Sequence, residues 1–255
     1  MRPTILISND DSIFSKGIKA IVEVAKKFGD VVVSAPDSPQ SAKSHSISLD
    51  SPISLREFDL FGKDVKAFAC SGSPADSIKL AFNHILDKKP DLVISGINHG
   101  SNFSINLIYS GTVAAAAEGA IHGVPSIAFS ITSHDADADF EATKIYAEKI
   151  IETVLNSKEK DICLNVNVPD INYSEIKGIK VCRQTKGAWF EEFTRIDHPN
   201  RNIPYFWLTG KYVNFEPEKT DTDVWAIENN YVSVVPIKID FTDYDMLEKL
   251  NKIME

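Results

Sequence analysis

The sequence predicts an α/β fold with a mostly parallel central sheet. Short apolar runs alternate with amphipathic helical segments over the first 160 residues, and repeated βα units of this kind build parallel sheets with right-handed crossovers. The 255 residues, 43% of them hydrophobic, suffice for one domain over 1–255. Within it we expect an α/β core over about 1–160 and a β-rich extension and oligomerisation region over about 161–255.

The core elements follow in chain order. Apolar residues recur at helical spacing in four segments. The second segment begins at Ser73-Pro74-Ala75-Asp76, where Ser73 can cap the helix, Pro74 fits its first turn and Asp76 complements the helix dipole. Residues 47–69 contain short β-prone pieces that predict a hairpin excursion. The predicted core strands are 4–8, 31–35, 91–95 and 126–130, and the predicted helices are 17–28, 73–86, 112–122 and 141–155.

The second part of the chain is richer in strands. Strands are predicted at 162–168, 179–182 and 231–235, followed by a helix over 243–254. Residues 185–223 show no regular pattern, and the stretch is too long for a simple loop. We therefore expect it to pack on a partner subunit or to cover the functional site.

Charge and composition narrow the class of protein. The net charge of −9 disfavours binding to nucleic-acid polymers, since such a chain repels phosphates outside a local positive site. The three cysteines stand far apart, without zinc-like spacing, as is usual in a reducing compartment. No signal peptide is evident, and no apolar stretch approaches the ~20 residues of a membrane span. We expect a cytoplasmic protein without a membrane partner.

Two adjacent carboxylates end the first predicted strand. Asp10 and Asp11 follow a run that reads as a buried parallel strand, where such charges are costly unless a cation compensates them. Oxygen ligands of this kind suit Mg²⁺ or Mn²⁺. The alternative is a solvated acidic turn, and this cluster alone leaves both readings open.

Other polar clusters follow the next strands. Ser41 and His45 lie in a loop after the second strand, and Asn98 follows the strand at 91–95. Since ligands of open α/β sheets bind at the carboxyl ends of the strands, these clusters together with Asn9-Asp10-Asp11 predict one functional site. Each cluster alone is also compatible with ordinary turn chemistry. His45 either contacts the substrate or is a loop histidine hydrogen-bonded among serines.

A third feature is the start of the Ala-rich helix at Ser110-Gly111-Thr112. Free backbone N–H groups and the helix dipole make such a start an anion site, and glycine lets a phosphate approach the backbone. A plain Ser or Thr cap is the alternative. A metal site beside an anion site describes a phosphate-ester hydrolase. Asp10 or Asp11 is the candidate for orienting or deprotonating the attacking water, and Asn9 is grouped with the substrate-binding residues.

These residues together resemble the survival protein SurE family of nucleotidases. The resemblance spans nearly the whole chain, and seven ordered motifs make a chance match very improbable. The seven motifs are Asn9-Asp10-Asp11; the loop with Ala35-Pro36-Asp37, Gln40-Ser41 and Ser44-His45-Ser46; Ser71-Gly72-Ser73-Pro74-Ala75-Asp76; Ser95-Gly96-Ile97-Asn98; Tyr109-Ser110-Gly111-Thr112-Val113; the acidic segment Thr220-Asp221-Thr222-Asp223; and Tyr231-Val232-Ser233-Val234-Val235-Pro236.

The resemblance implies a fold, an activity and a metal site. The implied fold is a Rossmann-like three-layer sandwich, with a C-terminal extension exchanged between subunits of a homodimer or homotetramer. The implied activity is hydrolysis of nucleoside monophosphates at the 5′ or 3′ position, and some members also trim short polyphosphate. One divalent cation, Mg²⁺ or Mn²⁺, is implied per subunit, held by the residues at the matching positions: Asp10, Asp11, Ser41 and Asn98.

Three positions depart from the family pattern. Ser12 and Asn230 stand where glycine is usual, and Ser104-Ile105-Asn106 replaces a more usual Gly-Asp-Asp. None of these positions is an inferred ligand. A receiver-type signalling domain is disfavoured by the length of the chain and by Ser-Gly-Ile-Asn at the end of the strand at 91–95. A nucleotide- or phosphate-sensing protein that binds without turnover stays as the alternative function.

Overall fold

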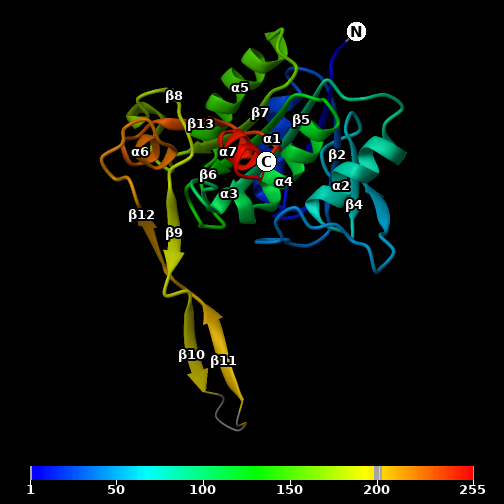
Figure 1. Cartoon of the computed structure of the whole chain (residues 1–255). Helices are drawn as coiled ribbons and strands as arrows, with labels where there is room; N and C mark the ends of the chain where they lie inside the picture. Colours follow the sequence, from blue (N-terminus) through cyan, green and yellow to red (C-terminus); the bar gives the residue numbers. More distant parts are fainter. Residues whose placement is uncertain (1, 198–200, 202, 255) are drawn as a thin grey trace.

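Within the part of the chain that the structure describes, nine strands form one central sheet (Figure 1). The computed structural model describes residues 2–197, 201 and 203–254. The strand order is β3-β4-β2-β1-β5-β6-β7-β13-β8, and neighbours from β4 to β7 run parallel. The bounds are β1 Thr4–Ser8, β2 Asp30–Pro36, β3 Leu55–Phe58, β4 Lys66–Cys70, β5 Leu92–His99, β6 Ser126–Ile131, β7 Cys163–Val168, β8 Ile179–Val181 and β13 Val232–Pro236.

Helices cover both faces of the sheet. Ile5 and Ile7 of β1 belong to a core cluster with residues of α1 (Lys16–Ala25) and α5 (Glu141–Asn156). The intervening Leu6 belongs to a second cluster with residues of α2 (Pro74–Leu80) and α4 (Gly111–Ile121). Because successive side chains of a strand point to opposite faces, both faces of β1 are buried. The predicted three-layer α/β sandwich with a mostly parallel sheet is confirmed.

The second predicted helix starts where its cap signal places it. Ser73 Oγ accepts a hydrogen bond from the Asp76 N–H at 3.1 Å, and Asp76 Oδ2 accepts one from the Ser73 N–H at 2.9 Å. This reciprocal capping satisfies two amide groups of the first turn. After Leu80 the segment continues as a π-helical turn over Ala81–Ile85, one residue short of the predicted end.

Two strands differ from their predicted form. β5 continues to His99, four residues beyond the predicted end, because pairing with β6 resumes at Asn98 and Ser130 after an irregularity. In the predicted excursion, β3 and β4 form an antiparallel hairpin, but β4 also pairs parallel with β2 and so extends the main sheet. Residues 47–49, predicted to be β-prone, form no strand.

Most of the stretch predicted to be irregular, 185–223, forms a long β arm, so that prediction is wrong for most of the described residues of 187–214, while 215–221 form no helix or strand. β9 (Gly187–Phe190) pairs with β12 (Lys211–Asn214), and β10 (Phe193–Asp197) pairs with β11 (Pro204–Leu208). Figure 1 shows these pairs projecting from the body of the molecule. Every residue of β10 and β11 is exposed, so no buried face imposes an alternating pattern on the sequence. Residues 198–200 and 202 of the predicted stretch lie outside the described residues.

The root of the arm is fastened to the sheet domain by charged groups. Arg183 contacts Glu216 at 2.5 Å and Asp221 at 2.9 Å. Asp223 starts α6 (Asp223–Glu228) and accepts the N–H groups of Ser104 and Thr185, each at 2.9 Å. These contacts join the arm to the loop before α3 (Asn106–Tyr109). The remaining elements are a 3₁₀ turn at Tyr173–Glu175 and α7 (Tyr244–Met254).

The described helices include none with the length and apolarity that crossing a membrane requires.

The positions that depart from the family pattern keep a backbone shape that favours glycine. Ser12, Ser104 and Asn230 have φ values of 93°, 48° and 66°. Non-glycine residues with positive φ are uncommon and cost on the order of 1 kcal/mol. These three residues therefore adopt a backbone conformation that glycine adopts without this cost.

Candidate active site

The predicted site residues meet where the strand order of the sheet reverses. From β1 the chain leads to β2 on one side, while β5 lies on the other side of β1. Ligands of open α/β sheets bind at the carboxyl ends of strands at such a point. A cavity of about 270 Å³ opens there, lined by Asp10, Ser41, Ala42, Asn98, His99, Gly100, Ser101, Asn102, Asn106, Tyr109, Ser110 and His134.

Asp10 is a buried carboxylate without a cationic side chain in its cavity. Only 4% of the residue is exposed, and no lysine or arginine is among the residues that line the cavity. Burial raises the pKa of Asp10 to about 6; hydrogen bonding from Thr112 opposes this rise and the charge of Asp11 adds to it. The Thr112 hydroxyl donates to Asp10 Oδ1. A cation at this carboxylate would offset the cost of burying its charge.

Asp11 is held by His99, a contact that the sequence interpretation did not include. Asp11 Oδ2 accepts the His99 N–H at 3.2 Å and lies 3.2 Å from His99 Nδ1. The aspartate side chain is 19% exposed. β5 continues to His99, four residues beyond its predicted end, and this continuation brings His99 within hydrogen-bond distance of Asp11. A group that holds a ligand carboxylate in place favours metal binding by fixing its orientation.

Asn98 presents an oxygen for a ligand. Its Nδ2 donates to the Gly100 carbonyl at 2.6 Å, which fixes the orientation of the amide. The carbonyl oxygen, Oδ1, is then the atom that remains to bind a cation. The residue is 9% exposed and lines the cavity, so the predicted ligand lies beside Asp10.

The loop after β2 brings Ser41 to the same cavity. The Gln40 N–H donates to the Asp10 carbonyl at 2.7 Å, and the Ser44 N–H donates to the Tyr109 carbonyl at 3.0 Å. Ser44 Oγ also donates to the Ile108 carbonyl at 2.7 Å. These bonds hold the loop across β1 and α3, and they place the exposed Ser41 in the cavity lining.

The start of α4 lies against Asp10. Ser110 lines the cavity, and its Oγ caps the helix by accepting the Val113 N–H at 3.1 Å. A Cβ added at Gly111 would lie 2.9 Å from Asp10 Cβ and 3.0 Å from Pro74 Cγ. Glycine therefore allows the helix N-terminus to approach the carboxylate closely, which brings the predicted anion site and the predicted metal donors together.

Gly111→Val should weaken metal binding as well as phosphate binding. A branched side chain has no space beside Asp10 and Pro74, so Asp10 must move. We expect the Mn²⁺ affinity of the variant, measured by isothermal titration calorimetry, to fall at least tenfold. Ala120→Val on the same helix is the control, because Ala120 lines a different cavity. Parent-like Mn²⁺ affinity in Gly111→Val would contradict this packing argument.

Four predicted substrate-binding residues are not among those that line this cavity: Asn9, His45, Gly111 and Thr112. Gly111 and Thr112 lie directly behind it, against Asp10. Asn9 is fully buried, and its Nδ2 donates to the Ser12 carbonyl at 2.8 Å and to Ser15 Oγ at 2.9 Å, so it shapes the turn after β1. His45 Nε2 lies 2.7 Å from Glu118 Oε2. Asn9 therefore stabilises the turn that carries Asp10 and Asp11, and His45 is held beside the cavity by Glu118 of α4.

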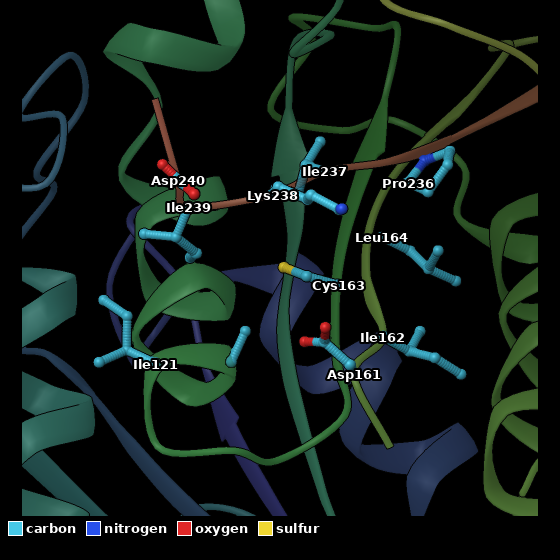
Figure 2. Close-up of a pocket in the computed structure, with 11 residues that line it drawn as sticks. Ile121, Asp161, Ile162, Cys163, Leu164, Pro236, Ile237, Lys238, Ile239 and Asp240 are labelled. Atoms are coloured by element: carbon cyan, nitrogen blue, oxygen red, sulfur yellow. The ribbon is translucent and has the colours of Figure 1, made fainter. Parts of the chain in front are cut away.

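A larger cavity lies elsewhere in the part of the chain that the structure describes. It measures about 810 Å³ and is lined by the end of α4, the start of β7 and the segment after β13, including Cys163 and Ile239 (Figure 2). None of the predicted site residues is among those that line it. Because β7 begins there, this cavity lies away from the carboxyl ends of the strands, and we assign the site from its chemistry rather than from volume.

The donor set at the strand ends fits a hard divalent cation. Among the described residues, no group of three or more histidine, cysteine, aspartate or glutamate side chains could hold a metal ion. The set is instead two carboxylates, one amide oxygen and one hydroxyl, from Asp10, Asp11, Asn98 and Ser41. Oxygen donors of this mixture suit Mg²⁺ or Mn²⁺, which also keep several waters.

Known proteins resemble this chain over nearly its whole length. The family model described as "Survival protein SurE" matches residues 5–191. The chain is 47% identical over 251 residues to the 5′-nucleotidase SurE of Flavobacterium johnsoniae, covering 98% of this chain and 96% of that protein. It is 48% identical over 254 residues to the 5′-nucleotidase SurE of Cytophaga hutchinsonii, covering 98% and 96%.

A solved structure supports the same assignment. The crystal structure of the SurE protein from Aquifex aeolicus matches with a TM-score of 0.84 and 40% sequence identity. The match covers 99% of this chain and all of that one. Sequence and structure agree over nearly the whole length, and the chain therefore belongs to the survival protein SurE family.

Proposed function

We propose that the protein hydrolyses nucleoside 5′-monophosphates to nucleoside and phosphate with one divalent cation, Mg²⁺ or Mn²⁺, per chain. One observation carries the proposal: the cavity combines oxygen donors with a helix N-terminus, while no lysine or arginine is among its lining residues. A phosphate beside Asp10 and Asp11 would be repelled unless a cation neutralised the carboxylates. The relatives named 5′-nucleotidase support the choice of substrate.

Each group at the site has a role in this proposal. Asp10, Asp11, Asn98 and Ser41 would hold the cation, which when bound supplies Lewis-acid polarisation of the phosphoryl group. The amides at Gly111 and Thr112 receive the phosphoryl oxygens, where negative charge develops in the transition state. Thr112 also orients Asp10 through its hydroxyl. Asp11, held by His99, orients the attacking water.

The same site would accept related esters. The cavity recognises a phosphoryl group through charge and backbone amides, and neither distinguishes the 5′ from the 3′ oxygen of a ribose. We therefore include 3′-nucleotides and short polyphosphate as further substrates.

A steady-state phosphate-release assay tests the proposal. Chelator-treated protein is supplied with Mn²⁺ and with nucleoside 5′-monophosphates, nucleoside 3′-monophosphates or tripolyphosphate. Release of phosphate that depends on added Mn²⁺ is expected. Binding of the nucleotide without release would favour the alternative, a nucleotide- or phosphate-sensing protein without turnover.

We also propose that the chain works as a homodimer or homotetramer. The β arm exposes aromatic side chains, among them Phe193 at 67% and Trp207 at 65%, and no residue of α7 is buried. Exposed apolar surface of this extent marks an interaction site.

Light scattering at micromolar concentration should report a dimer or a larger assembly. Trp207→Glu should shift the distribution towards smaller species, because a charge in an apolar interface is costly to bury. Lys211→Glu is the control, since this arm residue is already charged and is exposed. A parent protein that is monomeric at this concentration would count against assembly.

A further inference from the structure

A second cavity adjoins the proposed active site. It measures about 290 Å³, close to the lower end of the ~300–1,000 Å³ that is usual for small-molecule sites. Val113, Ala114 and Ala117 of α4 contribute one side, and Leu107 and Ile108 of α3 contribute another. Ile237, Lys238, Ile239 and Phe241, in the segment after β13, complete the lining. The lining is mainly apolar, unlike that of the cavity that contains Asp10 and Asn98.

The two cavities meet at Ser110. This residue belongs to the lining of both, and it caps the helix whose N-terminus is the proposed phosphate site. The loop that carries Ser41 also reaches both cavities, because Ser44 lines the apolar one. A group attached to a phosphate at the start of α4 would therefore extend directly to the apolar cavity.

One polar side chain that lines the apolar cavity, that of His45, is held in place by a buried carboxylate. His45 Nε2 lies 2.7 Å from Glu118 Oε2. Glu118 is 1% exposed and also binds Lys79 at 2.6 Å, with His122 at 3.6 Å. The buried carboxylate thus holds the imidazole by one nitrogen and leaves Nδ1 as the ring nitrogen for a ligand. A mainly apolar cavity with a few placed polar groups is the usual form of a small-molecule site.

We propose that this cavity binds the nucleoside part of the substrate. The apolar side chains of α3 and α4 contact the base, and His45, positioned by Glu118, hydrogen-bonds to the base. The proposal rests on the proposed nucleotidase function and adds to it, because it places the selectivity for nucleotides over other phosphate esters in the lining of this cavity.

The test compares two esters that differ in the base. A nucleoside 5′-monophosphate and ribose 5-phosphate present the same kind of phosphate ester, so the ratio of their kcat/KM values reports the contribution of the base. Ala117→Leu places a larger side chain from α4 in the cavity, and we expect it to lower this ratio at least tenfold. His45→Ala should lower the same ratio, with partial recovery in His45→Gln. Ala120→Leu on the same helix is the control, since it lines a different cavity.

The outcomes separate this inference from the proposed function. A parent ratio well above one, reduced by Ala117→Leu and not by Ala120→Leu, supports the nucleoside site. A parent ratio near one, or equal losses for both esters in Ala117→Leu, overturns it while the hydrolase assignment stands. Absence of phosphate release from both esters in the presence of Mn²⁺ overturns the proposed function itself.

Discussion

Asp10→Asn should lower phosphate release by on the order of 10³-fold at saturating nucleotide and limited Mn²⁺. The substitution removes the charge of the most buried proposed ligand while keeping its shape and an oxygen that accepts from Thr112. Because burial raises the pKa of Asp10, ionised Asp10 costs free energy in the metal-free protein near neutral pH. We therefore expect the metal-free variant to unfold in urea at a concentration at least as high as the parent does.

A carboxylate after the neighbouring strand provides the control. Asp37 follows β2, lies 3.6 Å from Arg56 and is not among the residues that line the active-site cavity. Asp37→Asn should keep phosphate release close to the parent value. Equal losses in the two variants would mean that net charge, rather than a metal ligand, sets the activity. Full activity of Asp10→Asn in chelator-treated buffer would show that Asp10 is not a ligand of a required metal ion.

Asp223→Ala should produce the largest loss of stability, at least about 3 kcal/mol of unfolding free energy. Asp223 is fully buried and accepts the N–H groups of Ser104 at 2.9 Å, Thr185 at 2.9 Å and Val224 at 2.8 Å. Removing the carboxylate leaves these buried donors without their acceptor. Urea denaturation followed by far-UV circular dichroism measures the change.

Asp221 gives a matched comparison two residues earlier. Its side chain is 64% exposed, and it contacts Arg183 at 2.9 Å. Exposed ion pairs contribute about 1 kcal/mol or less, so Asp221→Ala should cost much less than Asp223→Ala. Similar costs for the two variants would show that the carboxylate of Asp223 does not anchor the loop and the arm in the way described.

Local signals explain why much of the fold could be predicted from the sequence. The strand at 4–8 is apolar at three of its four buried positions, Ile5, Leu6 and Ile7. The Ser73-Asp76 cap sets the start of α2 within one residue. The acids after β1 and the glycine at the start of α4 lie together because parallel strands end at one edge of the sheet. Periodicity, capping and turn chemistry all act over a few residues, so they are visible without coordinates.

The remainder depends on contacts between distant segments. His99 reaches Asp11 only because β5 resumes its pairing with β6 after an irregularity. Glu118 holds His45 across 73 positions of the chain, and no local pattern marks that pair. The arm has no buried face, so β10 and β11 leave no alternation in the sequence. Long-range pairing and exposed strands are the features that sequence periodicity does not report.

Titration of Mn²⁺ into chelator-treated protein by isothermal calorimetry tests the metal site most directly. The account predicts one ion per chain in the parent, and loss of that binding in Asp10→Asn and in Asn98→Leu. Asp10 follows β1, whereas Asn98 lies in β5. Asp37→Asn should bind Mn²⁺ as the parent does. Parent-like Mn²⁺ binding in both site variants, or no binding in the parent, would contradict the assignment of these oxygen donors to a divalent cation.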